Sequence, residues 1–220
     1  MVAARNEADR IGATAAALRE AVPGIDVFVA DDASTDGTHE AALSAGATVI
    51  TRNLPHGKGG NMTAACTAAL DDLPAEATVL LCDGDLAASA GGLRPLIDSV
   101  ERGDCDLAVA AFERKVGGGL GLAKAYARRA IRDLSGYEAS APISGQRAMS
   151  AAVLRDVLPF APRYGMEIGM TVDAIRAGHR VCEVELDLSH RATGRTLAGF
   201  VHRGRQLRDF HAVRRSRRTA

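Results

Sequence analysis

The feature that most constrains the fold is the alternation of short apolar segments with helical segments over residues 1–112. We expect strands at residues 2–4, 26–30, 47–51, 79–82 and 106–112. Between them, apolar residues recur at helical spacing, as at Ile11, Ala15 and Leu18. Strands that alternate with helices form a mostly parallel sheet with helices on both faces. The sequence therefore predicts an α/β fold with a mostly parallel central sheet.

The later part of the chain continues this pattern less regularly. We expect an edge or cross strand at 143–149, a last strand at 180–188, and helices at 123–134 and 167–177. An arginine-rich helix is expected over 197–213. Residues 1–190 hold 18 basic and 26 acidic residues, so the body of the chain is acidic although the whole chain is neutral.

The apolar run 79–82 ends at Asp83-Gly84-Asp85, two carboxylates separated by one glycine. In open α/β sheets, ligands bind outside the carboxyl ends of the strands. Glycine lets the backbone turn tightly and approach a ligand. Two hard oxygen donors this close suit Mg²⁺ or Mn²⁺, which in turn holds a diphosphate. The alternative is a surface turn, because Asp-Gly is a common turn pair.

Polar residues also follow the neighbouring strands. Glu7 follows the first strand, Asp31-Asp32 ends the second, and segment 56–61, with three glycines and a lysine, opens a helix after the third. Glycines and a lysine at a helix start form a candidate anion site, although a flexible exposed loop is equally compatible. Right-handed crossovers bring these strand ends to one edge of the sheet, where we expect one site.

As a set, these segments resemble family 2 glycosyltransferases of the GT-A fold. The resemblance covers residues 1–190 and rests on segments 4–7, 31–38, 57–59 and 83–85. The second half is similar to glucosyl-3-phosphoglycerate synthases at 117–119, 142–147, 164–169 and 190–191. The resemblance implies one nucleotide-sugar-binding domain over 1–190, with 191–220 as a basic C-terminal helix and tail.

The resemblance also implies roles for single residues. Those implied to bind the nucleotide sugar are Ala4, Glu7, Asp32, Lys58, Asp83, Gly84 and Arg191. Asp32 would pair with the base. Those implied to contact the sugar or acceptor are Gly118, Gly119, Gly145 and Arg147. Asp85 and His190 would ligate the metal, and Asp85 and Glu167 would act in catalysis.

The chemistry of these residues agrees with such a reaction. A divalent ion stabilises the charge that develops on a leaving diphosphate, and Lys58 and Arg191 can add to that. Glu167 is a candidate general base toward an acceptor hydroxyl. Its alternative role is a helix-start carboxylate favoured by the dipole. Likewise, a lone histidine such as His190 is often a packed core residue.

We therefore expect a hexosyltransferase that uses Mg²⁺ or Mn²⁺ and a UDP- or GDP-linked sugar. The acceptor is expected to be a small molecule or lipid-linked. The synthases carry Arg-x-Thr after the glycine run to hold an acceptor phosphate, whereas this chain has Leu120-Gly121-Leu122, so 3-phosphoglycerate is not expected. Segment 117–121 is expected to be a lid. The first strand is shorter than the usual five or six residues, so we expect it to be truncated.

Other functional classes fit less well. A sugar-phosphate nucleotidyltransferase would share the sheet and the metal, but it would carry a glycine-rich loop with an arginine directly after the first strand. A Rossmann dehydrogenase would carry G-x-G-x-x-G at its first turn, which is absent here. A non-catalytic nucleotide-sugar or metal-binding module stays open. Turnover of a nucleotide sugar with Mn²⁺ would separate it from an enzyme.

The basic tail and the cysteines suggest partners and a compartment. The arginines beyond residue 190 favour peripheral contact with an anionic membrane surface, and we expect 214–218 to be free. Nucleic acid is not expected, because the body is acidic. Cys66, Cys82, Cys105 and Cys182 form no CxxC pair and are expected to be free thiols of a cytoplasmic protein. A homodimer is left open.

Overall fold

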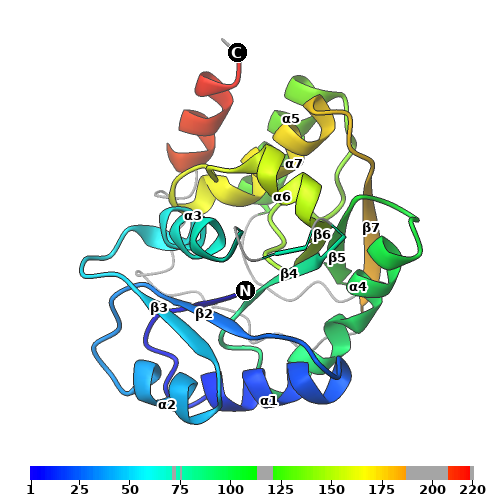
Figure 1. Ribbon diagram of the computed structural model, residues 1–220. Helices are drawn as coiled ribbons and strands as arrows, with labels where there is room; N and C mark the ends of the chain where they lie inside the picture. The colour runs from blue at the N-terminus through cyan, green and yellow to red at the C-terminus, as the bar shows by residue number, and fades with distance from the viewer. Residues whose placement is uncertain (71–72, 75, 113–120, 187–207, 219–220) are drawn as a thin grey trace.

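A computed structural model describes residues 1–70, 73–74, 76–112, 121–186 and 208–218 (Figure 1). Its centre is a seven-stranded sheet in the order β3-β2-β1-β4-β6-β5-β7. The strands are β1 Val2–Ala4, β2 Phe28–Asp31, β3 Thr48–Thr51, β4 Thr78–Asp83, β5 Leu107–Phe112, β6 Arg147–Ser150 and β7 Val181–Leu186. Every pairing is parallel except those of β6, which runs antiparallel to both β4 and β5. The predicted α/β fold is confirmed.

Helices cover both faces of the sheet (Figure 1). One face carries α1 Ile11–Ala21, α2 Thr38–Ser44, η1 Ala87–Leu93 and α4 Arg94–Glu101. The other face carries α3 Gly57–Leu70, α6 Ala151–Val157, η2 Arg163–Gly165 and α7 Met166–Arg176. Further out lie α5 Leu122–Ser135 and a C-terminal helix over residues 208–216. The short helix α6 was not expected from the sequence.

The apolar strands are buried on both faces because successive side chains of a strand point in opposite directions. In β4, Leu80 and Cys82 pack in the cluster that contains α1 and α4. Val79 and Leu81, which alternate with them, pack in the cluster that contains α3 and α6. This two-sided burial is typical of parallel sheets and explains the continuous apolar run.

The C-terminal helix packs against α7 and α5 and is not a free tail. Phe210 and Val213 are buried in a third cluster that includes residues of both helices. Gly165 and Gly169 allow the close approach: a side chain at Gly165 would overlap Val213, and one at Gly169 would lie 2.8 Å from the Arg217 guanidinium. The glycine spacing of four residues therefore forms a notch that receives the helix.

Two of the tail arginines form ion pairs, so the expectation that 214–218 is free is wrong. Arg214 pairs with Asp133 on α5, and its guanidinium lies 5.9 Å from the Tyr126 ring. Arg217 pairs with Asp173 on α7, with 2.7 Å between Nε and Oδ1. The carboxylates come from helices far away in sequence, and only the packing brings them to the tail.

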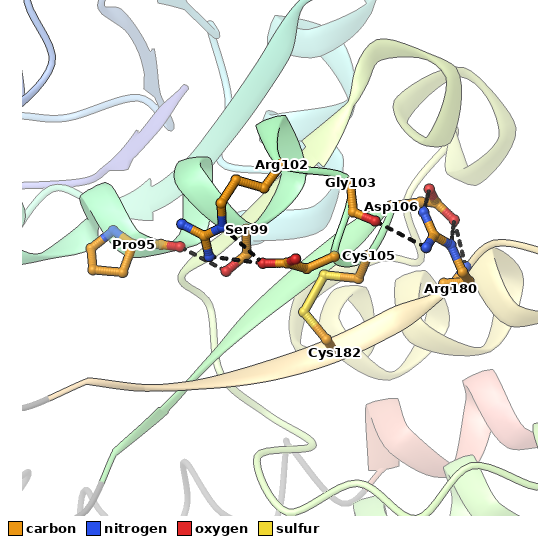
Figure 2. The surroundings of a disulfide bond; sticks show 9 residues. Pro95, Ser99, Arg102, Gly103, Cys105, Asp106, Arg180 and Cys182 are labelled. Carbon is orange, nitrogen blue, oxygen red and sulfur yellow. Dashed lines mark hydrogen bonds and ion pairs between the residues drawn. A yellow bond between two sulfur atoms is a disulfide. The ribbon is translucent and has the colours of Figure 1, made fainter.

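The expectation of four free thiols is wrong for two of them. Cys105, two residues before β5, forms a disulfide with Cys182, the second residue of β7 (Figure 2). The strands β5 and β7 pair in the sheet. Cys66 and Cys82 are free and buried. Burial raises the pKa of Cys66 to about 11 and that of Cys82 to about 12, so these thiols stay protonated at neutral pH. No described helix is long and apolar enough to cross a membrane.

Removing the disulfide should lower the free energy of unfolding by about 2–4 kcal/mol, because it closes a long loop in the unfolded chain. The bridge joins residues 77 positions apart. Urea denaturation of wild type and of Cys105→Ala/Cys182→Ala, each with and without reductant, measures this. Reductant should destabilise wild type and leave the double variant unchanged. Equal stability of wild type in both conditions would show that the bridge does not form in solution.

Candidate active site

A cavity of about 1120 Å³ lies at the carboxyl ends of β1, β2 and β4. The structure brings six of the predicted nucleotide-binding residues and the predicted metal ligand Asp85 to its lining; the six are Ala4, Glu7, Asp32, Lys58, Asp83 and Gly84. Right-handed crossovers between the parallel strands bring their polar ends to the same edge of the sheet, as expected. Four other predicted residues, Gly118, Gly119, His190 and Arg191, lie outside the described residues, as does most of the predicted lid at 117–121.

The Asp83-Gly84-Asp85 turn is held by backbone bonds and by one buried hydroxyl. The Gly84 N–H donates to the Ala3 carbonyl at 2.8 Å. The Thr14 hydroxyl donates to the Gly84 carbonyl and accepts from the Ala87 N–H, both at 2.8 Å. Thr14 is fully buried on the apolar face of α1. Sequence reasoning missed Thr14, although a threonine on an otherwise apolar helix face is a visible signal.

The two aspartates of the turn have different surroundings. The Asp83 carboxylate accepts from Lys58 Nζ at 2.7 Å and from Gln146 Nε2 at 2.8 Å. Asp85 is exposed in the cavity and forms no hydrogen bond or ion pair with the described residues. Asp85 is therefore the carboxylate with open coordination. Gln146 was also missed, since nothing in its local sequence marks it.

Negative charge accumulates beside Asp85. Burial raises the pKa of Glu7, and the charge of Asp85 raises it further, while Arg10 at 3.4 Å opposes the shift. A carboxyl with a raised pKa destabilises the fold in its ionised form, so this penalty is present at neutral pH and disappears as pH falls through that pKa. A bound cation would relieve the same repulsion.

Replacing Glu7 by glutamine should slightly stabilise the metal-free protein at pH 7, by less than about 1 kcal/mol. At pH 4 the difference should vanish, because the wild-type carboxyl is then largely protonated. Melting curves between pH 4 and 8, with and without Mn²⁺, test this. Mn²⁺ should stabilise the variant less than wild type. Exposed Glu20→Gln serves as control; an identical gain there would assign the effect to general charge.

Lys58 joins two parts of the chain. Its ammonium lies 2.7 Å from Asp83 Oδ1 and 3.1 Å from Glu167 Oε1. Burial alone would lower the pKa of Lys58, but the two facing carboxylates outweigh it and raise the pKa. Lys58 is thus a fixed cation beside the turn. Glu167, in the first turn of α7, reaches the site through Lys58 and is not part of the cavity lining.

The segment before β6 packs directly on this ion-pair cluster. A β-carbon on Gly145 would overlap Lys58 Nζ and lie 3.0 Å from Asp83 Oδ2. The next but one residue, Arg147, does not line the cavity: it is 1% exposed, and it donates to the Ser144 carbonyl and to Thr171 Oγ1 at 2.9 Å each. Burial lowers the pKa of Arg147 to about 10 against the opposing charges of nearby carboxylates. Arg147 thus stabilises the segment around Gly145, which packs against Lys58.

Comparison with known proteins identifies the family. Residues 1–158 match the family described as Glycosyl transferase family 2. The chain belongs to that family. Glucosyl-3-phosphoglycerate synthase from Mycolicibacterium paratuberculosis is 30% identical over 239 residues, which covers 96% of this chain and 67% of the relative. Undecaprenyl-phosphate mannosyltransferase from Micrococcus luteus is 29% identical over 208 residues, which covers 86% and 82%.

Solved structures agree with the family assignment. Glucosyl-3-phosphoglycerate synthase from Mycobacterium tuberculosis with Mg²⁺ and UDP superposes with a TM-score of 0.78 at 27% identity, covering 98% of this chain and 77% of that one. The same enzyme with Mn²⁺, UDP-glucose and phosphoglyceric acid gives 0.76 at 26% identity and the same coverages. The GT-A fold and the glycosyltransferase class are therefore confirmed, and the nucleotidyltransferase and binding-module alternatives are set aside.

In this glycosyltransferase, Asp32 organises the cavity wall. Its carboxylate accepts from the backbone N–H groups of His56 at 2.7 Å and Gly57 at 3.0 Å. These bonds fix the start of α3, which carries Lys58. A carboxylate has lone pairs for further donors, so contact with a base is compatible with this arrangement.

Backbone strain in the transferase is concentrated around the cavity. Among the described residues, four non-glycine residues have positive φ: Asn6 at 56°, Ala33 at 56°, Ala87 at 49° and Arg163 at 53°. Asn6 and Ala33 adjoin lining residues, Ala87 follows the aspartate turn, and Arg163 lines the cavity itself. Each such residue costs about 1–3 kcal/mol and persists where the surroundings impose it, typically at functional sites.

Proposed function

We propose that this transferase takes its sugar from a UDP-linked donor whose diphosphate binds with Mn²⁺ or Mg²⁺ at Asp85. The observation that carries the proposal is the exposed Asp85 carboxylate, without a hydrogen-bond or ion-pair partner among the described residues, in a cavity at the carboxyl ends of the parallel strands. The related synthase structures hold UDP together with Mn²⁺ or Mg²⁺.

The residues of this wall fit a hard divalent cation. Asp85 supplies an oxygen ligand, and Glu7, whose pKa is raised first by burial and then by the charge of Asp85, lies beside it. No cluster of three or more His, Cys, Asp or Glu suited to a metal occurs in the described part of the chain. The ion would therefore bind through Asp85, diphosphate oxygens and, as we propose, His190. When bound, it offsets the charge that develops on the leaving diphosphate.

The chain's own residues prepare the site for that step. Thr14 and Gln146 hold the aspartate turn in place, so Asp85 is presented without rearrangement. Lys58 stays charged between Asp83 and Glu167 and provides a second positive charge near the diphosphate. In this proposal Glu167 orients Lys58, and Asp32 accepts a hydrogen bond from the base.

A panel of donors tests the proposal directly. UDP-glucose, UDP-galactose, UDP-N-acetylglucosamine and GDP-mannose are added to the protein with Mn²⁺ or with chelator, and the melting temperature is measured. A ligand at 100 times its Kd adds about 2.7 kcal/mol of stability. UDP-sugars should raise the melting temperature only with Mn²⁺. A response to GDP-mannose alone would refute the UDP assignment, and no response to any donor would refute the donor site.

For the acceptor, we propose a phosphate-bearing molecule. The related proteins are named for 3-phosphoglycerate and for undecaprenyl phosphate, which share a phosphate group. Contact with an anionic membrane surface also stays a proposal. It is supported by the exposed Arg208, Arg215 and Arg218 and weakened by the ion pairs of Arg214 and Arg217. Co-sedimentation with anionic vesicles, lost at high salt, would confirm it.

A further inference from the structure

Two arginines line the cavity from the C-terminal half of the chain. Arg163 belongs to η2, directly before α7, and Arg208 is the first described residue of the C-terminal helix. Neither belongs to β1–β4 or their loops, which carry the aspartate turn and the other predicted nucleotide-binding residues within the described ranges. Their positive charge is therefore available for a ligand that binds beside the nucleotide sugar.

Arg163 is held over the cavity by an unusual backbone. Its φ is 53°, in the left-handed region, and it packs where Gly57 leaves space: a β-carbon on Gly57 would lie 2.9 Å from Arg163 Cγ. Gly57 itself has a φ of 71°. The Arg163 guanidinium is exposed and forms no hydrogen bond or ion pair with the described residues. A strained conformation that presents an unpaired cation to a cavity indicates binding rather than stability.

The C-terminal helix adds a second cation and a buried hydrogen-bond acceptor to the cavity. The Arg208 side chain is 66% exposed, and its ion pair is a 3.5 Å contact with Asp209. Asp209 is 8% exposed and also lines the cavity, yet its Oδ2 has no hydrogen-bond partner among the described residues. A buried polar atom without a hydrogen-bond partner is uncommon, and a functional role is one of its recognised explanations. The Arg214–Asp133 and Arg217–Asp173 pairs hold the helix in this position.

The donor side of the cavity has charged residues of its own, Arg5 included. Lys58 is held as a cation between Asp83 and Glu167, and the acidic wall of Glu7 and Asp85 suits a metal-bound diphosphate. Arg163 and Arg208 are surplus to that arrangement. An arginine fork binds phosphate oxygens in a bidentate manner.

We infer that Arg163 and Arg208 form the subsite for the acceptor's phosphate group, with Asp209 Oδ2 accepting a hydrogen bond from an acceptor hydroxyl. This inference rests on the proposed function and names the residues that select its acceptor. A free phosphate ester and a lipid phosphate present the same anion, so the test uses one probe of each kind: glycerol 3-phosphate and geranyl phosphate.

The experiment measures binding of each probe by calorimetry to full-length protein saturated with UDP and Mn²⁺. Arg163→Gly should weaken probe binding about tenfold or more, the loss expected for a charged hydrogen bond. Because glycine accepts a positive φ without strain, the melting temperature of this variant should equal or exceed that of wild type. Arg208→Ala should weaken probe binding to a smaller extent. The matched control is Arg215→Ala, exposed on the same helix but outside the cavity lining.

The outcomes separate this inference from the proposed function. If UDP fails to bind with Mn²⁺, the proposed function fails before any probe is added. If UDP binds but neither probe does, or if both probes bind Arg163→Gly as tightly as wild type, the subsite is refuted and the donor site stands. An equal loss of UDP affinity in Arg163→Gly would assign Arg163 to the donor and also refute the inference. Arg163-dependent binding of one probe alone supports the subsite and shows whether it takes a free phosphate ester or a lipid phosphate.

Discussion

Replacing Asp85 by asparagine should reduce sugar transfer by a factor of about 10²–10³, the loss typical of removing one group that stabilises transition-state charge. The fold should be unaffected, because Asp85 is exposed and holds no structural bond among the described residues. Asparagine keeps the size of the side chain but removes the charge that attracts a divalent cation. The Mn²⁺-dependent part of UDP affinity should therefore fall with the activity.

Calorimetric titration of UDP, with Mn²⁺ and with chelator, measures that difference directly. Asp104→Asn is the matched control, because Asp104 is also exposed and its ion pair with Arg102 at 2.8 Å lies outside the cavity lining. The control should bind UDP like wild type. If Asp85→Asn retained full Mn²⁺-dependent affinity, the metal would be held elsewhere and the central assignment of the site would be wrong.

Replacing Gly145 by alanine should also lower activity by about tenfold or more, since a displaced charge removes an electrostatic contribution to the transition state. The added methyl group would overlap Lys58 Nζ, which lies at the end of a flexible side chain and can move aside. The fold should therefore survive while the Lys58–Asp83–Glu167 cluster is broken. Lys58→Ala should show a similar loss, because it removes the same cation.

The double variant distinguishes a direct effect of Gly145 from one that acts through Lys58. If Gly145→Ala works by displacing Lys58, then Gly145→Ala/Lys58→Ala should be no less active than Lys58→Ala alone. Gly12→Ala is the control: it lies inside α1 with nothing within 4 Å of the added carbon, and it should be neutral or slightly stabilising. Fully additive losses would mean that Gly145 contacts substrate directly.

Local sequence was sufficient for most of the elements, although not for α6, and for the edge of the sheet where the site lies. The continuous apolar run before Asp83 predicts a strand buried on both faces, and β4 is such a strand. The polar residues after β1, β2 and β4 line one cavity, because parallel topology brings consecutive strand ends together. The family assignment followed from the order of these short segments.

Contacts between distant segments were decided by the tertiary structure alone. The sequence of strand 147–150 is compatible with an edge strand, but the strand lies between β4 and β5. This position places Gly145 and Gln146 against Asp83. From the sequence, Arg214 and Arg217 are expected in a solvated tail. In the fold, Asp133 of α5 and Asp173 of α7 lie close enough to pair with them. The Cys105–Cys182 bridge likewise depends on the pairing of β5 with β7.

The same division separates the two aspartates of the turn. Sequence determines that Asp83 and Asp85 stand together at a strand end, and only the family resemblance gives them different roles. The structure engages Asp83 with Lys58 and Gln146 and leaves Asp85 exposed to the cavity. The physical reason is that strand and turn formation depend on residues that are neighbours in sequence. Charge pairing depends on which side chains, distant in sequence, the packing brings within a few ångströms of each other.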